Sequence, residues 1–244
     1  ELSYDGAPAD PGARVVGARD LGRVDIVLPL LHGPYGEDGT IQGLLEMAEV
    51  RYVGCGVASS AVSMDKHLTK VVLAGAGIDV GRWELITPLQ WEADQGACLE
   101  RAAALGFPVF VKPCRAGSSV GISKVESREG LAVAIKEAQN HDPRVIVEAG
   151  VVGREVECGV LGGRADWRSA TAPLGEIEVP DGEFYDYEHK YVDDVVGLVC
   201  PAEVAPAYEE RVRETALRAF DALECEGLAR VDFFLDEDSG TVLV

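Results

Sequence analysis

The alternation of hydrophobic and polar positions at the start of the chain predicts a strand followed by a helix. Residues 23–31 (RVDIVLPLL) read as a buried strand. Residues 40–50 (TIQGLLEMAEV) read as an amphipathic helix, and its inward side chains are Ile41, Leu44, Leu45 and Ala48. A strand, a glycine-containing loop and a helix in this order indicate α/β organisation. The other strands of such a sheet are expected before residue 1, so the chain reads as a fragment or a processed product.

Short strands and helices are also predicted along the rest of the chain. Helices are expected over residues 63–77, 94–106, 127–138 and 205–225, with Ser63 and Ser127 as N-caps of the first and third. In residues 94–106 the predicted buried positions are Leu99, Ala103 and Leu105. Strands are expected over residues 83–86, 144–151, 154–163, 228–236 and 241–244, the last two forming a hairpin. Residues 106–125 (GFPVFVKPCRAGSSVGISKV) read as another hairpin.

Composition and charge narrow the possible partners. The 244 residues are 47% hydrophobic and 26% charged, which is typical of one or two globular domains. A net charge of -20 disfavours nonspecific binding to nucleic acid or to an anionic membrane. No apolar run is long enough to predict a transmembrane helix. The six cysteines form no C-x-x-C pair, so reduced thiols are expected rather than a zinc site or a disulfide framework.

Lys112 ends the apolar run VFVK and precedes a loop of small residues, AGSSVG. A lysine at a strand end can simply extend its amine into solvent. The loop favours a second interpretation, because its glycines let backbone N–H groups approach an anion and Ser118 and Ser119 add hydroxyl donors. The order differs from a Walker loop, which ends in its lysine, and from a kinase, in which the glycine loop precedes the lysine. A hairpin flap over a phosphate fits better.

Charged residues elsewhere also have two interpretations. Lys66 lies near a predicted helix start, where the macrodipole disfavours a cation unless Asp65 beside it offsets this effect or a bound anion shares the site. Glu148 and Glu155 are either solvated strand ends or acceptors for nucleotide amino and hydroxyl groups. Arg230 and Asp232 share one face of an otherwise apolar strand, and buried charges need partners or a metal.

Six strings in order resemble the D-alanine–D-alanine ligases of the ATP-grasp superfamily. They are HGPYGEDGTIQG, SMDK, VKPCRAGSSVGISKV, GREVECGVLG, FYDYEHKY and ARVDFFLD. The resemblance implies an α/β (α+β) ATP-grasp fold preceded by the tail of a Rossmann-like domain. The implied division is a partial N-terminal substrate domain (1–54), a central ATP-grasp subdomain (55–147) and a C-terminal ATP-grasp subdomain (148–244).

The resemblance also implies roles for individual residues. The positions implied to contact ATP are Lys66, Lys112 and Ser119 at the phosphates, Glu148 and Val151 at the adenine, and Glu155 at the ribose. The implied catalytic positions are His32 in the substrate pocket, Ser118, Lys190 and Tyr191 in the closing loops, and Arg230 at the tetrahedral oxyanion. Asp232 is implied to bind Mg²⁺ or Mn²⁺, and K⁺ is a further candidate ion.

Two parts of the family's site have no match in these residues. The remaining metal ligands, a Glu and an Asn, would follow Val244, and the N-terminal motif whose Glu holds the first substrate is absent. Residues 164–180 read as a segment longer than the family's minimal loop, and no role is assigned to them. Cys114 is predicted to take no part in the chemistry.

The implied reaction joins two D-alanines at the expense of ATP in a cytoplasmic homodimer that serves peptidoglycan synthesis. A D-alanine–D-lactate type of ligase is the first alternative, and Tyr191 favours the dipeptide product instead. Another ATP-grasp carboxylate–amine ligase and a noncatalytic ATP-binding module are further alternatives. Arg230 and Asp232 argue against the last, because binding alone requires no oxyanion donor beside a metal carboxylate.

Overall fold

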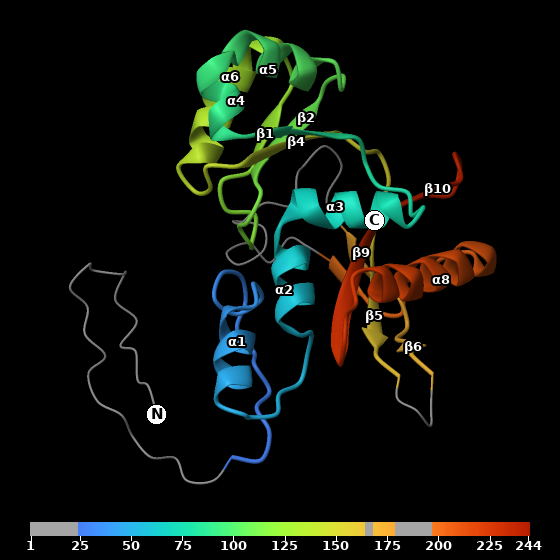
Figure 1. Ribbon diagram of the computed structural model, residues 1–244. Coiled ribbons are helices and arrows are strands. Elements are labelled where there is room, and N and C mark those ends of the chain that lie inside the picture. The colour runs from blue at the N-terminus through green and yellow to red at the C-terminus, as the bar shows by residue number, and fades with distance from the viewer. Residues whose placement is uncertain (1–23, 164–167, 179–196) are drawn as a thin grey trace.

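Two antiparallel sheets, each covered by helices, form the body of the protein (Figure 1). The structure is a computed structural model that describes residues 24–163, 168–178 and 197–244. Helix α3 (Lys66–Gly75) lies between the two sheets in Figure 1. Its Leu73, together with Ile78 just after the helix, packs against Ala219 of helix α8 (Pro206–Ala222). The described residues include no helix long and apolar enough to cross a membrane.

The first sheet has the strand order β1-β4-β2-β3. Its strands are β1 (Trp83–Ile86), β2 (Val109–Pro113), β3 (Ser123–Val125) and β4 (Val145–Ala149), and its helices are α4 (Pro88–Ala93), α5 (Gln95–Ala103) and α6 (Arg128–Gln139). Alternate residues of β2 and β4, among them Val109, Val111, Val145 and Val147, are buried in a core that includes residues of all three helices. Because side chains alternate along a strand, Lys112 and Glu148 lie on the opposite face.

The second sheet has the order β10-β9-β5-β7-β8, with β6 beside β5. Its strands are β5 (Arg154–Leu161), β6 (Ala170–Thr171), β7 (Gly175–Glu178), β8 (Gly197–Val199), β9 (Leu228–Asp236) and β10 (Thr241–Leu243). Helix α8 covers one face, where Phe220 packs with Val156 and Phe233. Glu155, Glu157, Arg230 and Asp232 alternate with the buried residues of β5 and β9 and therefore occupy the other face.

The predicted helix over residues 63–77 is in fact two helices. Helix α2 (Val57–Met64) ends where Asp65 takes an extended conformation, with φ -89° and ψ 102°. The Asp65 carboxylate accepts hydrogen bonds from the backbone N–H groups of His67 and Leu68 and so caps α3. The prediction of Ser63 as N-cap was wrong, because a second capping residue two positions later starts a new helix.

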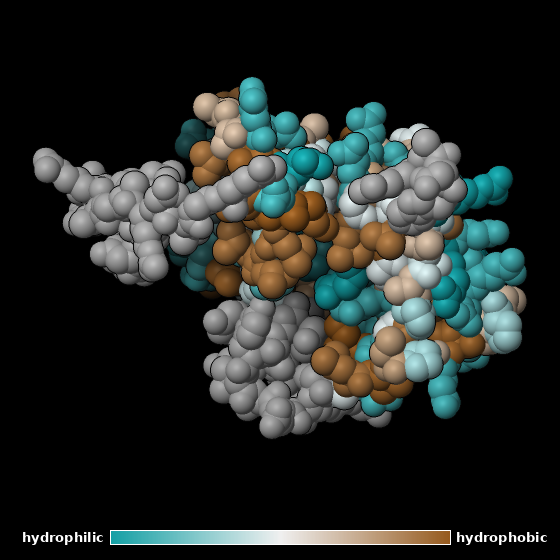
Figure 2. Space-filling model, turned by 90° about the horizontal axis from the view of Figure 1, so that it is seen from below, coloured by the Kyte–Doolittle hydropathy of each residue, from teal (hydrophilic) through white to brown (hydrophobic). Residues whose placement is uncertain are grey.

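The predicted buried strand over residues 23–31 is also wrong for the part that the structure describes. Val27 makes a single parallel bridge with Tyr52, and the large side chains around it are exposed, among them Ile26, Leu28 and Leu30. A strand is buried only when neighbours cover its faces, and the described residues supply one short partner. Viewed from below in Figure 2, hydrophobic residues gather on this side of the molecule.

Helix α1 (Thr40–Met47) is present, but only part of its predicted inward face is covered. Leu45 is buried, whereas Leu44 and Ala48 are exposed because little packs against that side among the described residues. In α5 the fully buried residues are Cys98 and Ala102, with Leu99 and Ala103 packed at the edge of the core. The hairpins over residues 106–125 and 228–244, the strand over residues 83–86 and helices α6 and α8 confirm the sequence predictions. The predicted domain limits after residues 54 and 147 stay predictions.

Candidate functional site

A cleft of about 660 Å³ has walls from both sheets and from α3. Several residues singled out in the sequence line it together: His32, Lys66, Lys112, Glu148, Glu155, Arg230 and Asp232. They come from segments far apart in the chain, and the packing of the two sheets on either side of α3 brings them together. Ser118, Ser119 and Val151 are described but are not among the lining residues. Lys190 and Tyr191 lie outside the described residues.

A carboxylate between two amines forms the floor of this cleft. Glu148 Oε2 lies 2.6 Å from Lys112 Nζ, and Glu148 Oε1 lies 2.8 Å from Lys70 Nζ. Lys112 and Glu148 are diagonal neighbours, because Phe110 pairs with Glu148 in the β2–β4 register. Burial alone would raise the pKa of Glu148, but the two lysines outweigh it and lower the pKa to about 2. Glu148 is therefore a permanent anion near neutral pH.

Lys66 is the first residue of α3 and reaches the base of the glycine–serine loop. Its Nζ donates to the Ala116 carbonyl oxygen at 2.6 Å, and its backbone N–H donates to the Cys114 carbonyl oxygen at 3.0 Å. Burial and the nearby charge of Lys112 lower the pKa of Lys66 to about 8, against the opposing effect of Glu148. A largely buried amine beside the amine of Lys112 is suited to hold an anion.

The glycine–serine loop between β2 and β3 has an unusual backbone. Ser118 and Ser119 both have positive φ, at 51° and 58°, a conformation that costs energy in non-glycine residues. Gly121 also has a positive φ, and a Cβ placed there would lie 2.4 Å from the His141 ring. A Cβ on Gly117 would lie 3.1 Å from Gly33 Cα, so the loop lies against the segment that begins at His32. The predicted flap thus adopts a strained and closely packed conformation, as functional loops often do.

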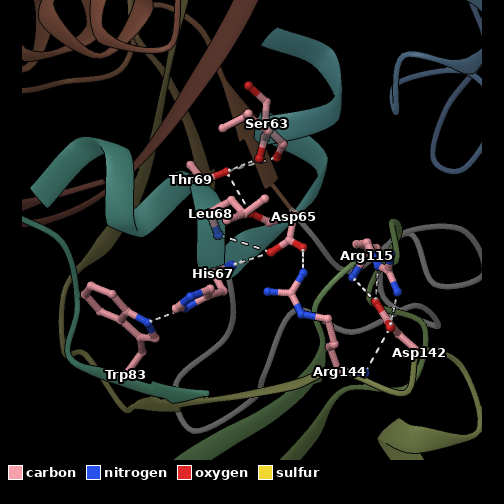
Figure 3. A network of polar contacts seen from close by, with 10 residues as sticks. Ser63, Asp65, His67, Leu68, Thr69, Trp83, Arg115, Asp142 and Arg144 are labelled. Carbon is pink, nitrogen blue, oxygen red and sulfur yellow. Dashed lines mark hydrogen bonds and ion pairs between the residues drawn. The ribbon is translucent and has the colours of Figure 1, made fainter. Parts of the chain in front are cut away.

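A network of two ion pairs, each with a buried aspartate, joins the start of α3 to the start of this loop (Figure 3). Arg144 Nη1 donates to the Asp65 carboxylate, which is almost fully buried, while Asp65 caps α3. The Asp142 carboxylate accepts from the Arg115 backbone N–H at 2.9 Å and from the Arg115 guanidinium in two bonds of 2.8 Å. The Arg144 backbone N–H donates to Asp142 at 3.0 Å, which joins the two ion pairs.

The aspartate at the base of the loop provides a direct test of this network. We expect Asp142→Asn to lower the free energy of unfolding by about 2 kcal/mol, because a neutral amide with one oxygen replaces a carboxylate that accepts from the backbones of Arg115 and Arg144 and from the half-exposed Arg115 guanidinium. Hydrogen exchange of residues 115–122 should accelerate with it. Glu126→Gln is a matched control just after β3, because Glu126 is exposed and its ion pair with Lys124 is long at 3.5 Å, so little change is expected. Equal exchange rates in the two variants would contradict an anchoring role.

The arginine and aspartate predicted on one strand face do lie together on β9. The Arg230 guanidinium donates to both Asp232 carboxylate oxygens, at 2.7 and 2.9 Å, and lies 3.1 Å from Glu157 Oε1. Both side chains are more than half exposed, at 59% and 60%, so they line the cleft rather than the core. The expectation of buried charges was wrong, because this face of β9 is the wall of the cleft and α8 covers the other.

Metal coordination is the part of the prediction with the least support in the geometry. Asp232 has its carboxylate occupied by Arg230, and Glu157 lies opposite it in the β5–β9 register. Among the described residues no three His, Cys, Asp or Glu side chains are grouped so that they could hold a metal ion. Asp232 therefore stays a predicted ligand within an incomplete set.

His32 is an exposed residue that lines the cleft. Its side chain is 80% exposed and its Nδ1 lies 4.0 Å from Glu37 Oε1. The other Glu37 carboxylate oxygen accepts from the Gly33 N–H at 2.6 Å, which fixes the turn that carries His32. Cys114 is fully buried, and burial raises its pKa to about 12, which supports the prediction that it takes no part in chemistry.

Sequence reasoning missed Lys70 and the ionic network. Lys70 follows Lys66 by four residues, a spacing that places both amines on one helix face, so the signal was present. Its amine also donates to the Gly81 carbonyl oxygen at 3.2 Å and lies 5.8 Å from the centre of the Trp83 ring. The pairings of Asp65 with Arg144 and of Asp142 with Arg115 had no local signal, because their partners are separated by 79 and 27 residues along the chain.

Comparison with known proteins identifies the relatives of this chain. The sequence model described as "D-ala D-ala ligase C-terminus" matches residues 72–244, and that described as "D-ala D-ala ligase N-terminus" matches residues 5–55. The chain belongs to the D-alanine–D-alanine ligase family. The two sheets and the cleft between them are therefore the ATP-grasp part of this family's fold, as the sequence predicted.

Individual relatives support the same placement. The D-alanine–D-alanine ligase of Pseudarthrobacter chlorophenolicus is 55% identical over 228 residues, which cover 92% of this chain and 60% of that protein. The D-alanine–D-alanine ligase of Mycobacterium bovis is 50% identical, covering 96% and 65%. Among solved structures, the VanG D-Ala:D-Ser ligase of Enterococcus faecalis has a TM-score of 0.79 at 40% identity, covering 94% of this chain and 63% of that one. The D-alanine–D-alanine ligase of Coxiella burnetii has a TM-score of 0.76 at 35% identity, covering 90% and 57%. This chain spans about three fifths of the length of the curated relatives it matches.

Proposed function

We propose that the protein uses ATP to join two D-alanine molecules into D-alanyl-D-alanine. The observation that carries this proposal is the convergence of Lys66 and Lys112 from one side, and Arg230 from the other, on a single cleft. Such an arrangement surrounds a polyphosphate and a reacting carboxylate with fixed positive charge in a chain of this ligase family. Positioning and charge neutralisation are the main contributions a protein makes to phosphoryl transfer.

The proposed reaction proceeds in two steps. The carboxylate of the first D-alanine attacks the γ-phosphorus of ATP. ADP departs as the leaving group, and D-alanyl phosphate is formed. The amine of the second D-alanine then attacks the acyl carbon, and phosphate leaves from the tetrahedral intermediate with formation of the peptide bond. Arg230 would donate to the oxyanion of that intermediate, where a fixed donor is most effective.

The residues of the cleft floor would divide the nucleotide between them. Lys66 and Lys112 would donate to phosphate oxygens, with the Ser119 hydroxyl and the loop N–H groups closing over them. Lys112 would then exchange the Glu148 carboxylate for a phosphate oxygen, while Lys70 keeps its bond to Glu148. Glu148 and Val151 are the proposed adenine contacts, and Glu155 the proposed ribose contact.

The remaining assignments rest on family membership. Ser118, Lys190 and Tyr191 would close the site, and His32 would lie in the substrate pocket. Asp232 would supply a carboxylate oxygen to Mg²⁺ or Mn²⁺, an ion that neutralises charge on the transferred phosphoryl group. A requirement for K⁺, a homodimeric assembly and a cytoplasmic place in peptidoglycan synthesis belong to the same proposal.

The acceptor has a second candidate because one similar structure is a D-Ala:D-Ser ligase. The protein expressed from its complete gene should therefore be assayed for ADP release with D-alanine alone, with D-alanine plus D-serine or D-lactate, and with L-alanine. Mass spectrometry of the products identifies the acceptor. We expect ADP release with D-alanyl-D-alanine as the main product. ATP binding without stimulation by any of these substrates would overturn the ligase proposal in favour of a noncatalytic module.

Lys66 makes ATP binding depend on pH. Its pKa of about 8 is below the ordinary value of 10.5, so without ligand the amine loses its proton as the pH rises past 8. A phosphate beside it favours the ammonium form, so binding between about pH 8 and pH 10 should take up a proton, and affinity should fall by up to tenfold per pH unit. At pH 6 both states are protonated and no uptake is expected.

Calorimetric titration of the protein with ATP in buffers of different ionisation enthalpy measures this uptake. The Lys66→Arg variant is the matched control, because a guanidinium stays charged over the whole range. We expect its affinity to be flat where the unmodified protein loses affinity. A wild-type affinity that does not change between pH 7 and pH 9 would show that Lys66 makes no contact with the phosphates.

A further inference from the structure

Two cysteine side chains from distant parts of the chain meet on the wall of the cleft. Cys55 precedes α2, and Cys225 lies in the turn between α8 and β9. Both line the cleft and both are half-buried. The Ser59 hydroxyl donates to Cys225 Sγ at 3.2 Å, and the two thiols lie close enough for each to shift the pKa of the other. No role proposed above uses either thiol.

The backbone imposes this contact. A Cβ added to Gly227 would lie 2.7 Å from the Gly54 nitrogen and 3.1 Å from its Cα, so these two glycines press their main chains together. Gly227 has a φ of 64° and Gly54 a φ of 118°, conformations that favour glycine. The contact between these neighbouring backbone segments brings the side chains of Cys55 and Cys225 to the same part of the cleft wall.

The surroundings of the pair favour a reactive sulfur. The Cys225 thiol donates to Cys55 and lowers the pKa of Cys55 below the ordinary range, against the effect of burial. The fully buried Cys158 shows the opposite behaviour, because burial raises its pKa as it does for Cys114. A thiolate that is hydrogen-bonded to a second thiol and reachable through a cleft is the form that reacts with peroxides and then closes to a disulfide.

We propose that Cys55 and Cys225 form an oxidisable dithiol that hydrogen peroxide converts into an intramolecular disulfide. The Cys55 thiolate attacks one peroxide oxygen, the O–O bond breaks, and the departing hydroxide takes a proton and leaves as water. Cys55 is then a sulfenic acid. The Cys225 sulfur attacks the Cys55 sulfur, the S–S bond forms, and the sulfenic oxygen leaves as a second water with the Cys225 proton. Two electrons pass from the thiols to the peroxide, and dithiothreitol reverses the change.

The link would tie together two walls of the cleft. Cys55 is followed by α2, which leads to Asp65 and Lys66, while Cys225 is followed by β9, which carries Arg230. This consequence rests on the proposed function. A covalent bond between these segments would restrain any change in the separation of Lys66 and Arg230 during turnover, so oxidation should slow ADP formation about tenfold or more.

Peptide mapping of the oxidised protein tests the dithiol without any need for turnover. The protein expressed from its complete gene is reduced, desalted, treated with a small molar excess of hydrogen peroxide, and digested after alkylation of the remaining thiols. We expect a Cys55–Cys225 disulfide peptide that disappears after dithiothreitol. Cys55 and Cys225 both recovered as alkylated thiols, or Cys55 linked to a different cysteine, would overturn the proposal.

Matched variants identify which of the two thiols reacts with the peroxide first. Cys225→Ser should leave Cys55 as a sulfenic acid that dimedone traps, whereas Cys55→Ser should trap little dimedone at Cys225. Cys200→Ser removes an exposed thiol elsewhere and should form the disulfide as the unmodified protein does. Equal dimedone labelling of the Cys225→Ser and Cys55→Ser variants would overturn the assignment of Cys55 as the attacking sulfur. If peptide mapping shows that the protein is fully linked and ADP formation is unchanged, the inference about cleft restraint is overturned. If the reduced protein also forms no ADP, the result counts against the ligase proposal alone.

Discussion

Replacing Glu148 with glutamine is expected to lower the free energy of unfolding by about 3 kcal/mol at neutral pH. The carboxylate lies 2.6 Å from Lys112 and 2.8 Å from Lys70, and all three side chains are largely withdrawn from water. Glutamine keeps the shape but leaves two close ammonium groups without a counter-charge. Removing one partner from a buried ionic cluster costs far more than the cluster contributes in total, because the remaining charge stays desolvated.

Two further variants separate this effect from a general loss of packing. Adding Lys70→Met to Glu148→Gln removes one of the two uncompensated cations, and we expect it to restore about half of the lost stability. Glu84→Gln is the matched control on the neighbouring strand β1, where Glu84 pairs with Arg101 at 3.2 Å and both are about one third exposed. Its expected cost is below about 1 kcal/mol. Chemical denaturation monitored by tryptophan fluorescence measures all three variants.

The pH dependence of the same difference provides an independent check. The pKa of Glu148 is lowered from 4.5 to about 2 in the folded protein, so the unfolded chain takes up the proton first as the pH falls. The stabilisation is therefore complete above about pH 5 and is lost as the pH falls towards 2, with a total of about 3 kcal/mol. The stability difference between the unmodified protein and Glu148→Gln should shrink over this window. A constant difference from pH 6 to pH 3 would contradict the assignment.

Arg230→Ala is expected to lower kcat for ADP formation by about 100- to 1000-fold, with ATP affinity changed little. This is the usual cost of removing one donor from a developing oxyanion. The guanidinium is 59% exposed and bonded to Asp232 and Glu157, so its loss should leave the fold intact, which circular dichroism can verify. The predicted pattern is a fall in kcat without a matching rise in KM for ATP.

Two controls test whether the effect depends on the donor geometry of arginine at position 230 and on its location in the cleft. Arg230→Lys keeps the charge but loses the paired donors that hold both Asp232 oxygens, so we expect activity between those of the unmodified protein and the alanine variant. Arg128→Ala removes an arginine from α6 that pairs with Glu100 and does not line the cleft, and it should retain full activity. An alanine variant at position 230 with more than about a tenth of the original kcat would remove Arg230 from the catalytic group.

Local patterns were sufficient for most of the regular elements. Hydrophobic alternation located β2, β4, β5 and β9, and helical periodicity located α6 and α8. Prediction was wrong at Ser63 and over residues 23–31. In the first case Asp65 is a stronger cap two residues later, and in the second the described residues provide only one bridge partner. Both errors arise where the outcome depends on competing or distant contacts.

The sequence by itself determined the ligase family, the order of the two sheet-forming regions and most charged residues that line the cleft, because local spacing and motif strings are sufficient for these. Only the tertiary structure decided which charges pair. Glu148 bonds Lys70 and Lys112, Asp65 bonds Arg144, and Cys55 meets Cys225. These contacts depend on strand register and on how α3 packs between two sheets, and the interaction energy of two charges or two thiols depends on separation in space rather than along the chain.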